Sequence, residues 1–340
     1  METHNITIVG GSGIVGREFL KILDEQNVPV GKVRILATQR SAGTEIFFRD
    51  QKIIVEETNP EKFNENDEVV FLTATSDVSQ QIAPIAKNHG SFVIDDSSAY
   101  RMDPQVPLVI PEVNANDLEW HQGIVSQPNC TTTPLVLALA PVHKENPLQH
   151  IVVSTYQALA GAGGAALKGL RSETKAALEG ESKPSGVQPR EIAFNAIPQI
   201  DIFAENNSTK EELKMLNETR KILSSPDIAI NATCVRIPTF FGHALSIWAK
   251  FTHPIEPNKA REQIQSMSGI SVQDDVKNEI YPTPLDAAGI DDVLVGRIRQ
   301  GNSNNELMLW AVTDSIRKGA ATNVLQIIQE ASKRGLIRRR

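Results

Sequence analysis

The chain has 340 residues, with 34 Lys and Arg against 41 Asp and Glu, which gives a formal net charge of −7. Hydrophobic residues make up 40% and charged residues 22%, a composition typical of globular proteins, so wholesale disorder and fibrous repeats are excluded. A mildly acidic chain without a dense basic stripe argues against general nucleic-acid binding, which needs clustered cations to neutralise phosphates. The length predicts two domains, each with its own core. One basic cluster, interpreted as a solvated end, comprises Lys333, Arg334, Arg338, Arg339 and Arg340.

The targeting and cysteine patterns predict a cytoplasmic protein. The sequence has no window of about 18 apolar residues for a membrane span, and residues 1–5 lack the charged-then-apolar pattern of a signal peptide. The two cysteines, Cys130 and Cys234, cannot form a disulfide framework, and neither lies in a Cys-x-x-Cys zinc pattern. We therefore expect no membrane contact and no metal site, and a role for either cysteine would be that of a thiol.

The first third of the chain alternates short apolar runs with helical patterns. This alternation is typical of an α/β protein with a parallel, doubly wound sheet. The expected strands are residues 6–9, 33–37, 69–72, 92–94 and 124–126.

A glycine-rich turn follows the first predicted strand and precedes a predicted helix at residues 17–23. It reads Gly-Gly-Ser-Gly-Ile-Val-Gly over residues 10–16 and satisfies the pattern G-x-G-x-x-G. A pyrophosphate can sit on the free N–H groups of such a helix start, because glycines let the backbone approach it. The alternative is a glycine-rich turn without a ligand. We expect a Rossmann-like dinucleotide-binding domain whose turn contacts the cofactor through Gly10, Gly11, Ser12, Gly13, Ile14, Val15 and Gly16.

The end of the second predicted strand favours NADP over NAD. An NAD site usually has Asp or Glu at this point for the ribose 2′-hydroxyl, but here residues 38–43 read Thr-Gln-Arg-Ser-Ala-Gly. Arg40 and the hydroxyl of Ser41 fit a 2′-phosphate instead. The alternative is that Arg40 is an exposed loop cation.

Cys130 lies where a helix is predicted to begin. Residues 128–134 read Pro-Asn-Cys-Thr-Thr-Thr-Pro and precede an apolar helical run at 135–139. Asn129 or a threonine suits the N-cap, so Cys130 is expected in the first turn, where the helix dipole favours thiolate over thiol. A cysteine in this setting is a candidate nucleophile. The alternative is a small buried residue at a helix start.

After Cys130 the pattern changes to longer strands with less regular helices between them. This predicts a second α+β domain with a largely antiparallel or mixed sheet, over residues 130–312. The segment 315–333 has apolar residues at helical spacing and is expected to pack back on the first domain, which would comprise 1–129 plus 313–340. The expected strands are residues 151–156, 228–237, 244–251, 293–299 and 307–312, and the expected surface loops are 181–189 and 301–305.

A second candidate for chemistry is His243, in the segment Arg-Ile-Pro-Thr-Phe-Phe-Gly-His over residues 236–243. A strand that ends in Pro and then Gly is expected to bend and present the imidazole to a cleft, where it could hold or deliver a proton for Cys130. Cys234 lies within an apolar strand pattern and is interpreted as a core residue. A Cys with a downstream His also fits a cysteine hydrolase, but a hydrolase has no use for a dinucleotide turn.

Taken together, these segments resemble the aspartate-semialdehyde dehydrogenase family along almost the full length of the chain. The resemblance rests on several motifs in the family's order: 10–16, Arg-Ser-Ala-Gly (40–43), Asp-Ser-Ser-Ala-Tyr-Arg-Met (96–102), Pro-Asn-Cys-Thr-Thr (128–132), Ser-Thr-Tyr-Gln-Ala (154–158), Glu-Glu-Leu-Lys-Met (211–215), Arg-Ile-Pro…Gly-His (236–243), Val-Gly-Arg-Ile-Arg (295–299) and Arg-Lys-Gly-Ala-Ala-Thr-Asn (317–323).

The resemblance implies reductive dephosphorylation of L-aspartyl 4-phosphate by NADPH, through a cysteine thioester, to L-aspartate 4-semialdehyde. It places the reaction in lysine, threonine and methionine (diaminopimelate) biosynthesis and implies a homodimer or homotetramer. A role of the domain at residues 130–312 in catalysis and dimerisation is implied only by this resemblance. It implies Cys130 as nucleophile and His243 as acid/base group, with Asn129 and Gln157 positioning the acyl centre. The implied substrate and phosphate ligands are Arg101, Lys214, Arg236, Glu211 and Gln157, and the implied NADP contacts include Ser12, Ile14, Val15, Arg40, Ser41, Ala160, Gly161 and Ser315.

The alternatives for these residues are ordinary surface roles. Glu211 and Lys214 lie three residues apart on a predicted helix and could simply pair with each other. The sequence also departs from the family at three points, with Ala244 and Leu245 for the usual Ser-Glu, Ser315 for Asn and Thr131 for Ser. Another acyl-phosphate or acyl-CoA reductase of similar fold, or a non-catalytic NADP-binding paralogue, are the competing hypotheses.

Overall fold

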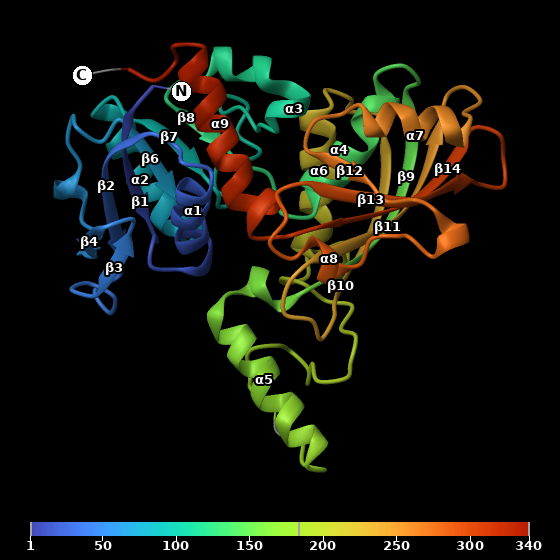
Figure 1. Ribbon diagram of the computed structural model, residues 1–340, viewed down its shortest axis with the longest axis horizontal. Helices are drawn as coiled ribbons and strands as arrows, with labels where there is room; N and C mark the ends of the chain where they lie inside the picture. Colours follow the sequence, from blue (N-terminus) through green and yellow to red (C-terminus); the bar gives the residue numbers. More distant parts are fainter. Residues whose placement is uncertain (1, 183, 339–340) are drawn as a thin grey trace. The chain divides into compact units, whose positions relative to one another are not determined.

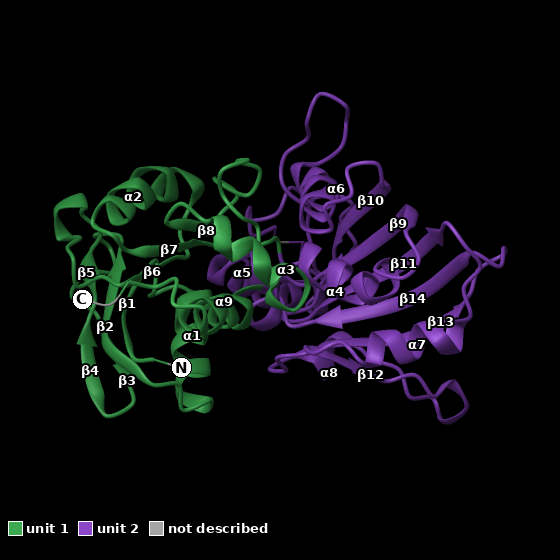
Figure 2. Cartoon of the chain, turned by 90° about the horizontal axis from the view of Figure 1, so that it is seen from above, with its two compact units in different colours: residues 1–129, 320–340 green, residues 130–319 purple. Residues whose placement is uncertain are grey.

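A computed structural model gives the fold and describes residues 2–182 and 184–338; Met1, Lys183, Arg339 and Arg340 lie outside the described residues. The chain divides into two compact units, coloured separately in Figure 2. Unit 1 comprises residues 1–129 and 320–340, and unit 2 comprises 130–319. The return to unit 1 at 320 differs from the expected 313, because residues 313–319 bond to unit 2: the Asp314 carboxylate accepts the Gly289 N–H at 2.8 Å.

Unit 1 is built on a parallel sheet of six strands in the order β5-β2-β1-β6-β7-β8 (Figure 1). The predicted strands are confirmed, and the sequence missed a short antiparallel hairpin, β3–β4. The elements are β1 (His4–Val9), α1 (Ile14–Glu25), β2 (Val30–Ala37), β3 (Glu45–Phe48), β4 (Gln51–Ile54), β5 (Glu56–Glu57), η1 (Pro60–Lys62), β6 (Val69–Leu72), α2 (Ser76–Asn88), β7 (Phe92–Asp95), α3 (Pro111–Asn114), η2 (Ala115–Trp120), β8 (Ile124–Ser126) and α9 (Thr322–Lys333).

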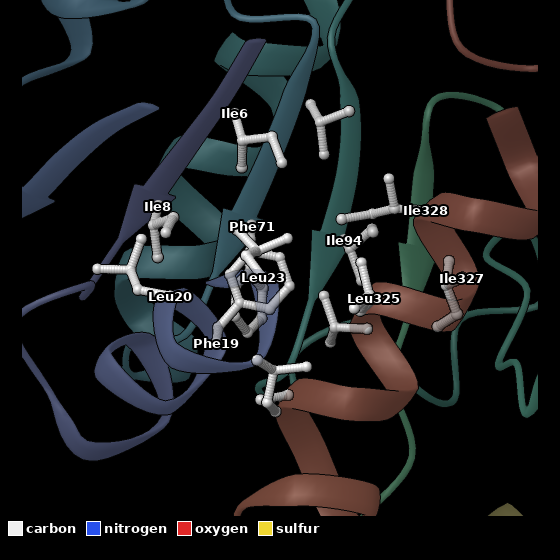
Figure 3. Close-up of a cluster of buried hydrophobic side chains, with 14 of the residues drawn as sticks. Ile6, Ile8, Phe19, Leu20, Leu23, Phe71, Ile94, Leu325, Ile327 and Ile328 are labelled. Carbon is white, nitrogen blue, oxygen red and sulfur yellow. The ribbon is translucent and has the colours of Figure 1, made fainter. Parts of the chain in front are cut away.

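Helices cover both faces of this sheet. On one face α1 and the C-terminal helix α9 pack together on the strands, as Figure 3 shows. On the other face α2 packs on the alternate strand residues. The buried strands read as continuous apolar runs because both faces are covered. The first cluster includes Ile6, Ile8, Phe19, Leu20, Leu23, Phe71, Ile94, Leu325, Ile327 and Ile328.

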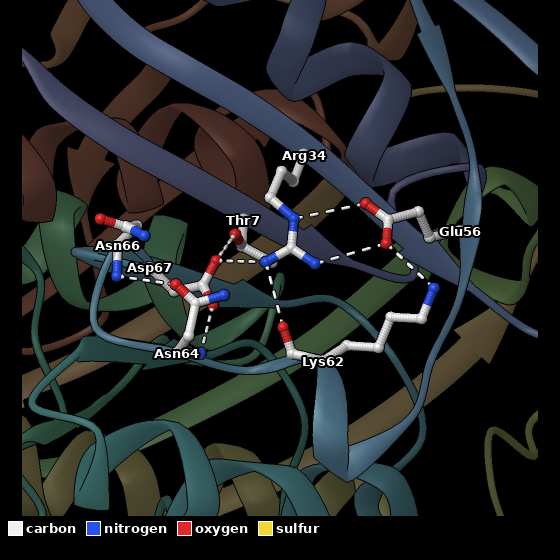
Figure 4. Close-up of polar contacts among 7 residues, drawn as sticks. All are labelled: Thr7, Arg34, Glu56, Lys62, Asn64, Asn66 and Asp67. Carbon is white, nitrogen blue, oxygen red and sulfur yellow. Dashed lines mark hydrogen bonds and ion pairs between the residues drawn. The ribbon is translucent and has the colours of Figure 1, made fainter.

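A network of hydrogen bonds and ion pairs joins β1, β2 and β5 to the segment before β6 (Figure 4). Arg34 of β2 donates to Asp67 at 2.7 Å and to Glu56 at 3.3 Å, and Lys62 donates to Glu56 at 3.1 Å. Thr7 of β1 donates its hydroxyl to the buried Asp67. Each charge of this network therefore has an opposite charge beside it.

Unit 2 contains a mixed six-stranded sheet in the order β10-β9-β11-β14-β13-β12, with parallel pairs only at its two edges. The predicted strands and both predicted loops are confirmed over the residues that the structure describes. The elements are α4 (Thr132–His143), β9 (Leu148–Gln157), η3 (Leu159–Ala162), α5 (Gly164–Leu178), α6 (Lys210–Ile222), β10 (Ala229–Arg236), β11 (His243–Phe251), α7 (Pro257–Gln265), β12 (Ile270–Val272), η4 (Val276–Asn278), α8 (Pro284–Ala287), β13 (Val293–Gln300), β14 (Glu306–Thr313) and a π-helical turn, η5 (Arg317–Ala321), which leads into α9.

The two faces of the unit 2 sheet differ. Helices α4, α6 and α7 contact one face. The other face carries partly exposed apolar and aromatic side chains, including Val152, Tyr156, Trp248, Met308 and Trp310. Sequence alternation explains the difference, because every second residue of β9, β11 and β14 points away from the helices. None of the described helices has the length and apolar character needed to cross a bilayer.

Candidate active site

The glycine turn of unit 1 leaves the start of α1 open to an anion. Gly10 has φ +81°, and a side chain there would collide with the Thr73 carbonyl oxygen. A side chain at Gly16 would collide with the backbone of Gly11. Gly13 is the N-cap, and no side chain among the described residues caps the helix. The first-turn N–H groups of α1 are thus available to a pyrophosphate, which fits the expected contacts by Ser12, Ile14 and Val15.

The next strand ends beside this turn and has no acidic residue at its carboxyl end. After β2 the chain forms a turn in which the Ser41 N–H donates to the Thr38 carbonyl at 2.8 Å. Arg40 is exposed there and forms no ion pair with any residue that the structure describes. Because β1 and β2 are neighbours in the sheet, Arg40 and Ser41 lie at the same edge as the glycine turn.

In unit 2 the sheet register brings three predicted site residues to one end of the sheet. β9 ends at Gln157 and β10 ends at Arg236, and these two residues are paired in the parallel ladder. β11 runs antiparallel to β9 and begins at His243, next to the ladder pair Ala244–Tyr156. The three side chains are far apart in the sequence, and strand pairing alone gathers them.

Ala158 links Arg236 to His243 through its backbone. Its carbonyl accepts a hydrogen bond from Arg236 Nη1 at 2.8 Å, and its N–H donates to His243 Nδ1 at 3.1 Å. Both side chains are buried, Arg236 with 7% and His243 with 0% of its surface exposed. Arg236 Nε and His243 Nε2 have no partner among the described residues. Two buried donors are therefore left over, which is costly unless a ligand uses them.

The contact with Ala158 fixes the tautomer of His243. Because Nδ1 accepts a hydrogen bond, the proton of the neutral ring is on Nε2. Burial, with a smaller effect from the charge of Arg236, lowers the pKa of His243 to about 3. Gly161 of η3 lies over the ring, where an added Cβ would be 3.4 Å from Nε2. His243 is therefore a neutral hydrogen-bond donor at physiological pH.

A chain of hydrogen bonds extends from Gln157 to one cation and two carboxylates. Gln157 Nε2 donates to Glu211 at 3.1 Å, and Thr155 donates its hydroxyl to Gln157 Oε1 at 2.8 Å. Lys214 donates to Glu211 at 3.1 Å and to Asp201 at 2.9 Å. Burial lowers the pKa of Lys214, but the two carboxylates outweigh it and the pKa is raised. The alternative that Glu211 and Lys214 pair on their helix is true, and the pair is joined to Gln157.

The sequence predicted Cys130 in the first turn of a helix, but Cys130 precedes that helix. Helix α4 begins at Thr132 with Thr131 as N-cap, and the Thr131 side chain makes no capping hydrogen bond. The thiol is partly exposed, whereas Cys234 is buried, with its sulfur 3.6 Å from that of Met215. Burial strongly raises the pKa of Cys234, which makes it inert. These contacts confirm Cys234 as a core residue. The partial exposure of Cys130 does not fit the alternative that it is a small buried residue.

Electrostatics connects Cys130 to Arg236. Burial lowers the pKa of Arg236, while negative charge on Glu211 and on Cys130 raises it. The thiol is therefore within electrostatic range of the guanidinium, and the guanidinium has no ion pair with any described residue. An anionic substrate group would supply the missing charge.

The remaining predicted site residues divide between the units. In unit 2, Ala160 is buried in η3 and Ser315 is buried with no partner for its hydroxyl in the described part of the chain. In unit 1, Arg101 is buried and donates to the Asp96 carbonyl at 2.7 Å, and Asn129 is buried at the end of that unit. Within residues 2–182 and 184–338 no group of His, Cys, Asp and Glu is arranged to hold a metal ion.

Sequence reasoning missed Ala158, Thr155 and Asp201. Ala158 acts through its backbone, which leaves no signal in the residue type. Asp201 lies nine residues before the start of the helix that carries Glu211 and is joined to that helix only by folding. The position of Thr155, two residues before Gln157 on the same strand, is the one signal that could have been used.

Two family descriptions match the chain. Residues 5–121 match the description "Semialdehyde dehydrogenase, NAD binding domain", and residues 139–318 match "Semialdehyde dehydrogenase, dimerisation domain". Aspartate-semialdehyde dehydrogenase of Aquifex aeolicus is 44% identical over 98% of this chain and 99% of its own length. The enzyme of the same name from Bacillus subtilis is 42% identical, with the same shares covered.

A solved structure shares the fold. Aspartate semialdehyde dehydrogenase II of Vibrio cholerae, complexed with ASA, superposes with a TM-score of 0.94 at 36% identity and covers 98% of this chain and 99% of its own. The likeness extends over both units, so the parallel and the mixed sheets described above are those of these relatives.

Proposed function

Because the chain belongs to the aspartate-semialdehyde dehydrogenase family, we propose that it converts L-aspartyl 4-phosphate to L-aspartate 4-semialdehyde with NADPH. The observation that carries this proposal is the meeting of two buried, unsatisfied donors, Arg236 Nε and His243 Nε2, at Ala158, with the partly exposed Cys130 within electrostatic range of Arg236. This reaction would be a step in lysine, threonine and methionine (diaminopimelate) biosynthesis. A cytoplasmic location remains a prediction of the sequence.

Cys130 acts as the nucleophile. Its thiolate attacks the acyl carbon, a carbon–sulfur bond forms, and the bond to the phosphate oxygen breaks, so that inorganic phosphate leaves. The resulting thioester accepts hydride more readily than a carboxylate does. Bound NADPH supplies that hydride. The carbon–sulfur bond then breaks, which releases the aldehyde and restores the thiolate.

His243 stabilises the oxygen that becomes negatively charged during these steps. The neutral ring donates from Nε2, and the buried setting makes such a donor effective. The depressed pKa argues against a standing positive charge on the ring. Asn129 and Gln157 orient the acyl group as amide donors.

The cations divide between the two acidic parts of the substrate. Arg236, with a planar fork of donors and no ion pair among the described residues, binds the α-carboxylate. Glu211 faces the substrate amine, while Lys214 and Arg101 hold the departing phosphate. The hydrogen bond from Gln157 to Glu211 couples acyl positioning to amine binding.

We propose NADP as the cofactor in preference to NAD. The open start of α1 suits the pyrophosphate, and the exposed Arg40 suits a 2′-phosphate. Ala160, Gly161 and Ser315 would contact the nicotinamide end. The variant Arg40→Ala should raise the Kd for NADP about tenfold and leave that for NAD unchanged. Equal losses for both nucleotides would contradict the assignment.

We further propose that the protein forms a homodimer, or a homotetramer built from dimers. The subunits are joined through the open face of the unit 2 sheet. That face carries Tyr156, Trp248 and Trp310, and it lies within the segment that matches a dimerisation domain. Analytical ultracentrifugation of Trp248→Asp should show a monomer where the parent chain sediments as a larger species. A parent chain that sediments as a monomer would contradict the proposal.

The reaction is tested in reverse, by NADP reduction with aspartate semialdehyde. Turnover should require phosphate, and coenzyme A should not replace it. Cys130→Ala should abolish turnover, and the matched control Cys234→Ala should retain it, because only Cys130 is partly exposed. Retention of activity by Cys130→Ala would exclude the covalent mechanism, and dependence on coenzyme A would indicate a related acyl-CoA reductase.

A further inference from the structure

Asp314 forms several hydrogen bonds with the backbone of the turn at residues 314–319 of unit 2. Asp314 Oδ1 accepts the N–H groups of Ile316 at 2.8 Å and Arg317 at 3.3 Å, and Oδ2 accepts that of Gly289 at 2.8 Å. Its carbonyl accepts the Gly319 N–H at 3.1 Å. A single buried residue thus fixes both ends of the turn and ties it to the segment after α8.

The last residue of this turn lies against the backbone of Cys130. A Cβ built on Gly319 would be 3.0 Å from Cys130 Cβ, which is tighter than most Cβ contacts, and it would be 3.3 Å from the Asp314 carbonyl oxygen and 3.4 Å from Cys130 Cα. The φ angle of Gly319 is not positive, so conformational freedom does not explain the glycine. The close approach to Cys130 does.

The local geometry is also unusual in the helix itself. Gly319 belongs to η5, a π-helical turn, before the regular helix α9 begins at Thr322. Single π turns are rare and frequently occur at functional sites. The wider turn and the missing side chain together leave the space that Cys130 occupies.

We propose that Asp314 and Gly319 are positioning residues for the Cys130 thiol. Gly319 supplies the space in which the Cys130 Cβ sits, and Asp314 holds Gly319 in place through the turn. Both residues act through Cys130 and not through contact with the substrate. The inference rests on the proposed function only in taking Cys130 as the nucleophile, and its test does not require turnover.

The first test is the rate at which iodoacetamide alkylates Cys130, followed by peptide mass spectrometry as a function of pH. Gly319→Ala displaces the Cys130 Cβ by a few tenths of an ångström, so alkylation should slow about tenfold, and the midpoint of its pH profile should shift because the surroundings of the sulfur change. The variant should still fold, because alanine is compatible with the φ angle of Gly319, and thermal unfolding should be lowered only modestly by the close contacts with Cys130 and the Asp314 carbonyl oxygen. An unchanged rate and midpoint in a folded variant would overturn the proposal.

The second test separates the clamp from general stability. Asp314→Asn keeps an oxygen for the Ile316 and Arg317 N–H groups and should retain most of the alkylation rate, whereas Asp314→Ala should lose it about as strongly as Gly319→Ala. Asp275→Ala is the matched control, since Asp275 caps the exposed turn η4 in the same unit. An equal loss in the Asp275 and Asp314 variants would show a merely structural role. Should Cys130→Ala retain turnover, the proposed function fails while these alkylation results still decide the positioning role.

Discussion

Two arginines lie in polar clusters of opposite character, one in each unit. Arg34 has a carboxylate on each side of its guanidinium and forms ion pairs with Asp67 and Glu56 (Figure 4). Arg236 donates to a carbonyl and forms no ion pair with the residues described. Burial lowers the pKa of both side chains. The carboxylates beside Arg34 outweigh burial, so the pKa of Arg34 is raised overall. Negative charge on Glu211 and Cys130 does not outweigh burial, so the pKa of Arg236 stays lowered.

The difference in ion pairing distinguishes a cluster that supports the fold, around Arg34, from a cluster that can bind a ligand, around Arg236. The Arg34 cluster is complete, so nothing is gained there by binding another ion, and its charges stabilise the amino end of a sheet. In the cluster around Arg236, the guanidinium Nε and the imidazole Nε2 have no hydrogen-bond partner among the described residues. A buried polar group that the protein does not satisfy is costly, and a substrate that satisfies it recovers that cost on binding.

Substitution of His243 should produce the largest effect on catalysis. His243→Leu removes the Nε2 donor and should lower kcat by about 10²- to 10³-fold, with little change in thermal unfolding. Steady-state kinetics and calorimetry on the same preparation measure both. His4→Leu is the control, because His4 is also a buried histidine but bonds to Ser332 at 2.9 Å in the core of unit 1. It should lose stability and keep kcat; the reverse pattern would abolish the distinction between the clusters.

Substitution of Arg34 should affect stability and not turnover. Arg34→Met leaves Asp67 buried beside Thr7 without its cation, and should lower the free energy of unfolding by about 3 kcal/mol. Denaturant unfolding measures the loss. The double variant Arg34→Met/Asp67→Asn should recover part of it, because no unpaired charge is then buried. A loss of kcat at unchanged stability would place this cluster in the site.

Replacement of Arg236 by lysine should act on substrate binding. Arg236→Lys keeps the charge but loses the planar fork of donors, so KM for the semialdehyde should rise about tenfold with a smaller effect on kcat. Stability should hold or fall slightly, since a buried positive charge without a counter-ion remains and the hydrogen bond to the Ala158 carbonyl is weakened. An equal fall in kcat without any rise in KM would assign Arg236 to the transition state instead of the α-carboxylate.

Acid titration should show the smallest effect. Burial raises the pKa of Glu56, but hydrogen bonds from Arg34 and Lys62 outweigh it and hold the pKa below its ordinary value of 4.5. Its contribution to stability is present above the ordinary pKa and is lost as the pH falls through the lowered one. The free energy of unfolding, measured against pH, should therefore decline less steeply in acid for Arg34→Met than for the parent chain. Parallel curves would show that Glu56 does not depend on Arg34.

Most of the fold could be predicted from the sequence because its strands are short apolar runs between clear turn signals. The start of α4 was misplaced because Thr131 and Thr132 are equally suited to cap a helix, so local preference cannot decide between them. The return to unit 1 was misplaced because residues 313–319 belong to unit 2 through contacts such as that of Asp314 with Gly289.

The candidate site could be predicted only where residue type carries the chemistry. Cys130, His243 and the glycine turn have side chains or spacings with a direct chemical meaning. The tautomer of His243 depends on the N–H of Ala158, and the second anchor of Lys214 depends on Asp201. Both contacts arise from chain segments that meet only after folding, and no pattern in the sequence records them.

The helix α9 has a consequence for how the chain is made. Its residues Leu325, Ile327 and Ile328 belong to the core of unit 1, yet all of unit 2 is translated between β8 and this helix. While the ribosome is still adding unit 2, one face of the finished parallel sheet, with Phe71 and Ile94, remains without part of its cover. The nascent chain therefore presents an apolar surface for chaperones until α9 has emerged.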